Sequence, residues 1–239
     1  MKKLTTYLFF VVLVVGMAFL YSFSSIKNFS KTIGKVIVEF EEGSNDFLTQ
    51  EMVNKLLIQN QQGVKNQRKS VIDLQGLEYS VLSNPYIESA TVFFTIDGVL
   101  NTIVKQRTPV ARINTFNSSY YIDKQGVEVP LSDNYSARVL LVTGKINKED
   151  LKEITGFVNV ILGDDFLRKE VIGIHKMQSN EFVLSVRSGE YKIELGSLDD
   201  LNTKFKKLKA FYNMAFVDKT IEQYRTINLK YRDQVVCAK

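Results

Sequence analysis

The stretch SATVFFTIDGVLNTIVK, residues 89–105, decides the fold of the first globular part of the chain. Its two halves, 89–96 and 99–105, are rich in β-branched and aromatic residues, which favour strands. Asp97 and Gly98 separate the halves, and this residue pair is typical of a two-residue type I′ turn. We therefore expect a β-hairpin that closes with this turn.

The residues before the hairpin predict one more strand and two helices. The run VIVEF, residues 36–40, has the composition of a short strand. Thr49 and Asp73 are residue types that cap helix N-termini, and apolar side chains follow each at helical spacing. Pro85 ends the second helix, because proline disfavours helical backbone in the residue before it. The order strand, helix, helix, strand, strand predicts two helices on one face of a three-stranded sheet. It resembles a POTRA module, a fold that binds proteins by adding strands at a sheet edge.

Further toward the N-terminus, residues 4–23 read LTTYLFFVVLVVGMAFLYSF and carry no charge. A helix of about 20 residues covers about 30 Å, the hydrocarbon thickness of a bilayer. The alternative is a cleaved signal peptide, whose apolar core is shorter and ends in an A-x-A-like site, which Ser22-Phe23-Ser24 imitates only weakly. We expect an uncleaved single-pass anchor. Because almost the whole chain follows it, we expect a cytoplasmic N-terminus and an extracytoplasmic body.

After Pro109 the sequence predicts a β-rich part. The expected strands are residues 110–113, 120–122, 139–143, 175–178, 181–187, 191–195 and 227–236. Two helical patterns interrupt them, and their apolar faces are formed by Leu151, Ile154, Val158 and Ile161, and by Leu201, Phe205, Leu208 and Tyr212. We expect a β domain with packing helices.

The expected fold class is therefore α+β, with an N-terminal transmembrane helix, a POTRA-like βααββ module and a β-rich domain with packing helices. The expected divisions are a cytoplasmic tail at 1–3, the transmembrane helix at 4–23, a stalk at 24–34, the POTRA-like domain at 35–108 and the β domain at 109–239.

The sequence contains no constellation of catalytic residues. His175 is the only histidine and Cys237 the only cysteine, so metal clusters and a Ser-His-Asp triad lack candidates. We expect an ordinary surface or half-buried histidine and a thiol in a frayed tail. Glycine-rich phosphate loops and the H-E-x-x-H motif are absent. We therefore expect no enzymatic activity, cofactor, metal or small-molecule substrate.

The formal charge of +5 is modest for a nucleic-acid protein. The most basic stretch, residues 204–209, interleaves lysines with Phe205 and Leu208 at helical spacing. We expect a solvated helix face and no nucleic-acid binding, with contact to an anionic lipid or an acidic partner as the alternative.

Five segments resemble the bacterial cell-division family FtsQ, also called DivIB, in the family's order and behind an anchor. They are NPYIESATV at 84–92, VKQRTPVA at 104–111, YIDKQG at 121–126, LLVTG at 140–144 and INLKY at 227–231. The chain departs from the family pattern in three places. An acidic residue common before Pro-Val-Ala is absent, Asn228 replaces an acidic residue of the closing strand, and there is no tryptophan.

This resemblance implies a non-enzymatic scaffold in the cytoplasmic membrane at the division septum. Such a protein joins early and late division proteins by binding FtsB and FtsL, which are small single-pass partners, and its POTRA module is associated with recruitment. Two alternatives remain: a POTRA-bearing secretion or envelope-assembly component, and a cell-wall hydrolase.

The closing strand, expected at 226–236, is the candidate partner-binding site. A strand at or near a sheet edge offers backbone groups that a second chain can pair with. We expect one face of this strand to hold the core and the other to help form the FtsB-like contact, with Tyr231 as an anchor. A purely core role for Tyr231 is the alternative. The candidate residues are Ile227, Leu229, Lys230, Tyr231 and Arg232.

Overall fold

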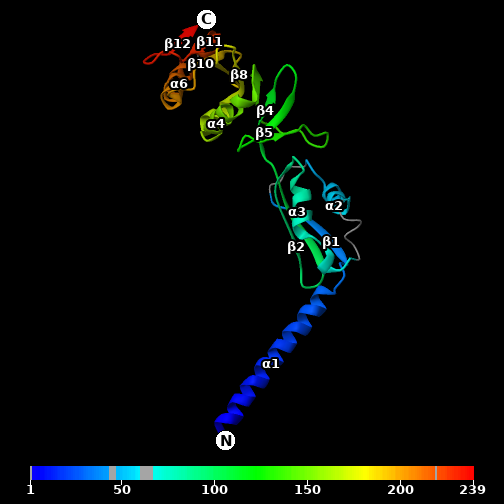
Figure 1. Cartoon of the computed structure of the whole chain (residues 1–239). Helices are drawn as coiled ribbons and strands as arrows, with labels where there is room; N and C mark the ends of the chain where they lie inside the picture. The colour runs from blue at the N-terminus through cyan, green and yellow to red at the C-terminus, as the bar shows by residue number, and fades with distance from the viewer. Residues whose placement is uncertain (1, 43–46, 60–66, 219) are drawn as a thin grey trace. The chain divides into compact units, whose positions relative to one another are not determined.

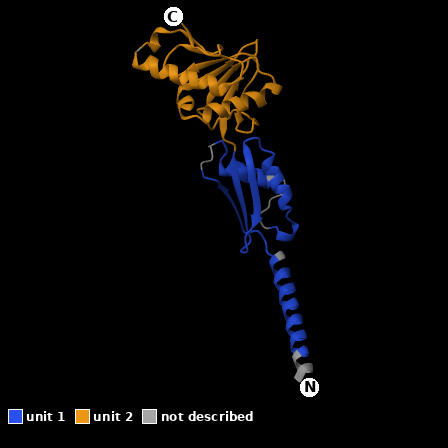
Figure 2. Cartoon of the chain, turned by 90° about the vertical axis from the view of Figure 1, so that its left-hand side faces the viewer, with its two compact units in different colours: residues 1–106 blue, residues 107–239 orange. Residues whose placement is uncertain are grey.

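The computed structural model describes residues 2–42, 47–59, 67–218 and 220–239. The chain forms two compact units, Met1–Gln106 and Arg107–Lys239, which are coloured separately in Figure 2. Unit 1 holds an apolar helix and a small α+β body, and unit 2 is richer in strands. The expected mixed α+β fold class, with an N-terminal apolar helix and a β-rich C-terminal region, is confirmed.

The chain begins with the long helix α1 (Lys2–Phe29) (Figure 1). Its stretch Tyr7–Asn28 contains 18 consecutive residues with a mean hydropathy of 2.2 and is, among the described residues, the one helix long and apolar enough to cross a membrane. The apolar side chains from Tyr7 to Ile26 are exposed to the surroundings rather than packed on protein. The helix runs past Phe23, so the first part of the segment expected as a stalk is helical.

The body of unit 1 has the expected order of elements. Its elements are β1 (Lys35–Phe40), α2 (Gln50–Gln59), the 3₁₀ turn η1 (Lys69–Val71), α3 (Leu74–Leu82), β2 (Ile87–Phe94) and β3 (Val99–Gln106). The sheet order is β1-β3-β2, with β1 parallel and β2 antiparallel to β3. The helices α2 and α3 bury Leu57 and Leu77 completely, as β3 does Leu100. Asp73 caps α3 by accepting the N–H of Gly76 at 3.0 Å.

The β2–β3 hairpin closes with a different turn from the one expected. Gly98 has φ +89°, whereas Asp97 is not among the residues with positive φ, so the type I′ turn is wrong. Thr95 N–H donates to Val99 O at 2.9 Å, and Gly98 N–H donates to Thr95 O at 3.2 Å. The loop therefore has three residues, 96–98, with only its last in the left-handed region. This solution needs positive φ at glycine alone, which costs less strain than a left-handed Asp97.

Unit 2 is built on a nine-stranded sheet with the order β12-β11-β10-β9-β8-β7-β4-β5-β6. Its strands are β4 (Pro109–Asn114), β5 (Ser119–Asp123), β6 (Glu128–Val129), β7 (Leu140–Gly144), β8 (Val171–Lys176), β9 (Phe182–Val186), β10 (Lys192–Gly196), β11 (Thr226–Asn228) and β12 (Val236–Ala238). The pairs β4–β7, β7–β8 and β10–β11 are parallel, and the remaining neighbours are antiparallel.

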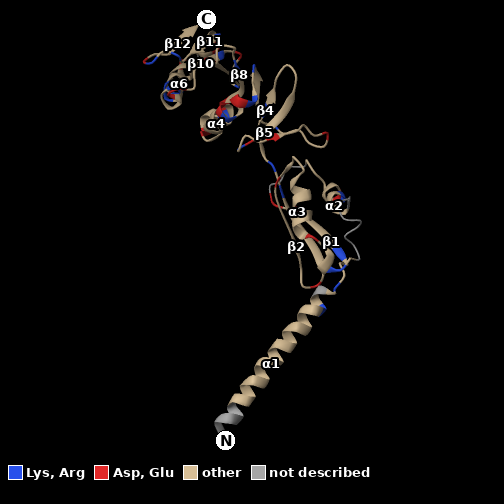
Figure 3. Cartoon of the chain, viewed as in Figure 1, with Lys and Arg blue, Asp and Glu red and all other residues tan. Residues whose placement is uncertain are grey.

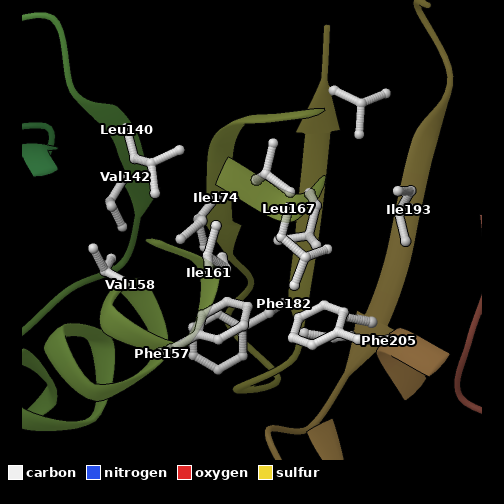
Figure 4. Close-up of a cluster of buried hydrophobic side chains, with 14 of the residues drawn as sticks. Leu140, Val142, Phe157, Val158, Ile161, Leu167, Ile174, Phe182, Ile193 and Phe205 are labelled. Carbon is white, nitrogen blue, oxygen red and sulfur yellow. The ribbon is translucent and has the colours of Figure 1, made fainter. Parts of the chain in front are cut away.

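The helices α4 (Leu151–Leu162) and α6 (Leu201–Val217) share one hydrophobic core with this sheet (Figure 4). Phe157 of α4 stacks on Phe205 of α6 with ring centroids 6.4 Å apart, and it meets Phe182 of β9 edge-on at 5.6 Å. All four apolar residues predicted to line α4 are buried. The shorter elements are α5 (Asp165–Glu170) and the 3₁₀ turns η2 (Lys148–Asp150) and η3 (Ile221–Gln223).

Three details of unit 2 differ from expectation. The strand β8 covers Val171–Lys176 instead of starting at His175, because Gly173 interrupts the apolar pattern that would have marked it. The strand β6 and the helix α5 were not predicted, because each is too short to show a periodic pattern of apolar residues.

The basic stretch of α6 is less solvated than expected. Lys204 is buried and donates to Ser197 O at 2.7 Å, and this burial lowers its pKa. Lys209 pairs with Asp164, the residue that caps α5. These lysines tie α6 to its own unit.

Candidate partner-binding site

The expected closing strand at 226–236 is wrong in extent, because the segment forms two short strands joined by residues 229–235. The strand β11 ends at Asn228, whose Oδ1 accepts the backbone N–H of Lys230 at 2.9 Å. Such a local bond competes with the strand ladder. The ammonium of Lys207, on α6, also donates to the carbonyls of Leu229 and Tyr231. Both contacts turn the chain away from strand geometry.

The strand β11 pairs parallel with β10 on one side and antiparallel with β12 on the other. It lies next to the edge, and β12 forms the edge itself. Arg225 N–H donates to Ala238 O at 2.8 Å, so Ala238 turns its carbonyl toward β11. Since successive residues of a strand alternate, the N–H and C=O of Cys237 point toward the open edge.

Ile227 and Leu229 belong to the core of unit 2. Both are fully buried, and Ile227 lies opposite Ile193 in the parallel register. Leu229 N–H donates to Glu194 O at 2.9 Å, so its backbone continues the β10–β11 pairing. These two residues anchor the segment in the core of unit 2 and expose no side-chain surface to a second chain.

Lys230 lies in an acidic surrounding on the opposite side of the segment. Its ammonium is 2.7 Å from Glu181 Oε2 and 4.0 Å from Glu194 Oε2, while Asn228 Nδ2 donates to the same Glu194 oxygen at 2.8 Å. The hydrogen bond to Glu181 raises the pKa of Lys230. The charge of Lys230 is thus largely neutralised within the unit.

Tyr231 and Arg232 are the exposed members of the candidate set. The side chain of Tyr231 is 51% exposed, so the core alternative does not describe it. Its carbonyl is held by Lys207, which fixes the backbone beneath the ring. Arg232 is exposed too, and none of the ion pairs found among the described residues includes it.

Sequence reasoning missed the edge strand β12. The signal was present, because the polar run Arg232-Asp233-Gln234 precedes the strand-forming run Val235-Val236-Cys237. Cys237 lies opposite Ile227 and packs partly against the core, so the expected frayed tail is wrong. Burial raises the pKa of its thiol, which lowers its reactivity.

No group of three or more His, Cys, Asp or Glu side chains that could hold a metal occurs in the described part of the chain. His175 is exposed on β8, and its Nδ1 lies 2.9 Å from Thr143 Oγ1. The closing strands therefore remain the candidate site.

Comparison with known proteins shows which family this chain is similar to. A family model described as "FtsQ/DivIB, C-terminal related" matches residues 108–238. Cell division protein DivIB of Clostridium acetobutylicum is 23% identical over 193 residues, which cover 75% of this chain and 75% of that protein. Short-chain-enoyl-CoA hydratase of Clostridioides difficile is 31% identical over 83 residues, 35% of this chain and 54% of the enzyme. This last match is too partial to assign an activity.

An apolar N-terminal helix followed by a mixed α+β body fits a single-pass membrane protein. The chain belongs to the FtsQ/DivIB family, so its role lies in cell division. This family is non-enzymatic.

Proposed function

We propose that this protein is a scaffold at the division septum that joins early and late division proteins by binding FtsB- and FtsL-like single-pass partners. The observation that supports this proposal most is the family match over residues 108–238, which covers the unit whose sheet ends in the open strand β12. The unpaired backbone of such an edge is a template for a second chain.

The proposed mode of binding is strand addition to β12. The outward N–H and C=O of Cys237 supply main-chain pairing, and Tyr231 and Arg232 contact the partner beside it. Main-chain pairing gives affinity, and the neighbouring side chains give specificity. Because Glu181 neutralises Lys230, Arg232 is the cation that favours an acidic residue in the partner.

Backbone geometry provides a sharp test of this mode. Cys237→Pro removes an N–H that points away from β11, so β12 stays paired while its open edge loses a donor. We expect the full chain carrying Cys237→Pro to bind the partner's outer segment at least tenfold more weakly, and Cys237→Ala to bind normally. Tyr231→Ala should cost about 2 kcal/mol if this residue is a binding anchor. Normal binding by a folded Cys237→Pro protein would refute strand addition at β12.

Leu229→Pro is unsuitable for the same test. Leu229 N–H donates to Glu194 O, so proline there breaks the β10–β11 ladder and unfolds the site rather than probing it.

The proposed topology has the N-terminus in the cytoplasm, α1 in the membrane, and both the α+β body of unit 1 and the whole of unit 2 outside. A reporter fused after Lys239 should be active only if it works outside the cytoplasm. Activity of a cytoplasm-only reporter at this position rules the topology out.

The proposed role of the POTRA-like domain, residues 35–108, is recruitment to the septum. Deleting 35–105 while keeping α1 and unit 2 should disperse the protein around the envelope. If the deleted protein still accumulates at septa, the recruiting signal lies in α1 or in unit 2.

A further inference from the structure

The outer end of α1 and the tip of the β2–β3 hairpin form a hollow of about 530 Å³. Its polar lining comes from Tyr21, Ser24, Lys27, Asn28 and Lys31, and Ile96 of the hairpin closes it. Positions 24, 27 and 28 follow helical spacing and share one face of α1, and Lys31 follows just beyond the end of the helix. The hollow belongs entirely to unit 1.

The hollow lies just beyond the apolar run of α1, at the level that lipid headgroups occupy when this helix spans a bilayer. Tyr21 is 77% exposed near the end of the apolar run, where tyrosine favours the interface. Lys27 stands about 9 Å further along the helix, at 1.5 Å per residue. The headgroup layer beyond the hydrocarbon is about 5–8 Å thick on each side, and lysine side chains reach into it.

Two lysines converge on the hairpin tip. Lys31 Nζ donates to Ile96 O at 2.9 Å, and Lys69 Nζ donates to Thr95 O at 2.6 Å. Lys69 also lies 5.3 Å from the ring centroid of Phe94. These partners are neutral, so they hold the ammonium groups in place without cancelling their charge.

The charge around the hollow is almost entirely positive. No acidic residue occurs in the chain before Glu39. None of the ion pairs among the described residues includes Lys27, Lys31, Lys35 or Lys69. Figure 3 shows Lys and Arg in blue where α1 meets β1, with no red along α1. Asp97 at the hairpin tip is exposed, but it does not line the hollow.

Ile96 is the second indication of contact with lipid. Its side chain is 83% exposed at the tip of the hairpin, immediately beside the outer end of the membrane-spanning helix. An isoleucine in this position gains by entering the boundary between headgroups and acyl chains.

We propose that this hollow is a binding site for one anionic phospholipid of the leaflet nearest the globular body. The lipid phosphate contacts Lys27 and Lys31 with help from Ser24 and Asn28, its acyl chains lie along the apolar surface of α1, and Ile96 dips into the interface. A soluble anion would lack the apolar contact, and a zwitterionic headgroup would bring its own cation against the lysines.

The first experiment measures lipid choice with the full chain. The protein is placed in nanodiscs of equal phosphatidylglycerol and phosphatidylcholine, and native mass spectrometry counts the lipid that each released chain retains. We expect one retained phosphatidylglycerol. In the double variant Lys27→Gln/Lys31→Gln, the ratio of retained phosphatidylglycerol to retained phosphatidylcholine should fall. Each lost lysine should lower this ratio about fivefold, since a lysine near an anionic surface contributes roughly 1 kcal/mol.

Matched variants separate the site from general charge effects. Lys169→Gln/Lys206→Gln removes the same charge from exposed positions of unit 2 and should leave the ratio unchanged. Lys27→Arg/Lys31→Arg should restore it, and Asp97→Asn should leave it equal or raise it. An unchanged ratio in a folded Lys27→Gln/Lys31→Gln protein, or an equal fall in the unit 2 variant, overturns the proposal.

A second readout tests the position of Ile96. In a Cys237→Ala background, a fluorophore on Ile96→Cys should be quenched by nitroxide-labelled lipid more strongly in phosphatidylglycerol discs than in phosphatidylcholine discs. A fluorophore on Tyr79→Cys, which lies on α3 and is 77% exposed, is the control. Equal quenching at 96 in both lipids contradicts the site. None of these measurements involves a protein partner, so their outcome is independent of scaffold function.

Discussion

Arg107 Nη1 donates to Asp123 Oδ2 at 2.7 Å and so ties the first residue of unit 2 to the turn that follows β5. The other oxygen of Asp123 accepts the backbone N–H groups of Gln125 and Val127, each at 2.9 Å. Two of the segments that resemble the family therefore meet at one buried carboxylate.

The first prediction concerns this carboxylate. Asp123→Ala should lower the free energy of unfolding by about 3 kcal/mol, because it removes the two hydrogen bonds that one carboxylate oxygen accepts in the turn and takes the carboxylate away from the largely buried guanidinium of Arg107. Asp123→Asn should cost less because one acceptor remains. Urea unfolding of the fragment 35–239 measures both, with the exposed Asp133→Ala as control. A loss no larger than that of the control would contradict the role of Asp123.

The second prediction concerns stability in acid. Asn147 N–H and the ammonium of buried Lys176 bond to the Asp150 carboxylate and lower its pKa. The stabilisation is therefore complete above the unfolded pKa of about 4 and is lost as the pH falls through the lower folded value. We expect Asp150→Asn to cost about 2 kcal/mol at pH 7 and progressively less as the pH falls below about 4. Glu149→Gln is the control, and a pH-independent cost would rule this linkage out.

The third prediction concerns Gly144. Its φ is +117°, and an added Cβ would lie 2.0 Å from Lys176 O. Gly144→Ala should therefore destabilise the fragment by about 3 kcal/mol or more, because backbone must move. Gly156→Ala on α4 meets nothing within 4 Å and should stabilise it by about 0.5–1 kcal/mol. Similar melting temperatures for the two variants would disprove this difference.

The fourth prediction concerns Cys237. Since burial raises the pKa of its thiol, iodoacetamide at pH 8 should alkylate the folded chain more slowly than the urea-unfolded chain. Occupation of the β12 edge by a partner should slow the reaction further. Equal rates in folded and unfolded protein would show that β12 is not docked on β11.

The periodicity of apolar residues was sufficient to predict the elements that bury one whole apolar face. Leu151, Ile154, Val158 and Ile161 repeat at helical spacing, and all are buried in α4. The two sequence halves of the hairpin were equally clear. The turn of the hairpin could not be predicted, because Asp-Gly is compatible with a two-residue loop and also with the three-residue loop observed. In that loop the backbone N–H and C=O of Thr95 bond to Val99 and Gly98.

The candidate site was harder to predict because distant contacts shape it. The alternation of Ile227, Leu229 and Tyr231 continues a strand pattern, yet Lys207 of α6 and the side chain of Asn228 end β11. The pattern placed Ile227 and Leu229 on one face, but both were expected among the partner-binding residues and the structure buries them. The pairing of Lys230 with Glu181 depends on residues 49 positions apart. A single sequence does not contain that proximity.

The order of the strands also has a consequence for biosynthesis. Among the described residues β12 pairs with β11 alone, and α6 lies between β10 and β11 in the sequence, so the open edge forms after these preceding elements have left the ribosome. A chain still being synthesised exposes β10 as a temporary boundary instead. The edge that β12 presents to its surroundings thus exists only in a chain that has been synthesised as far as residue 238.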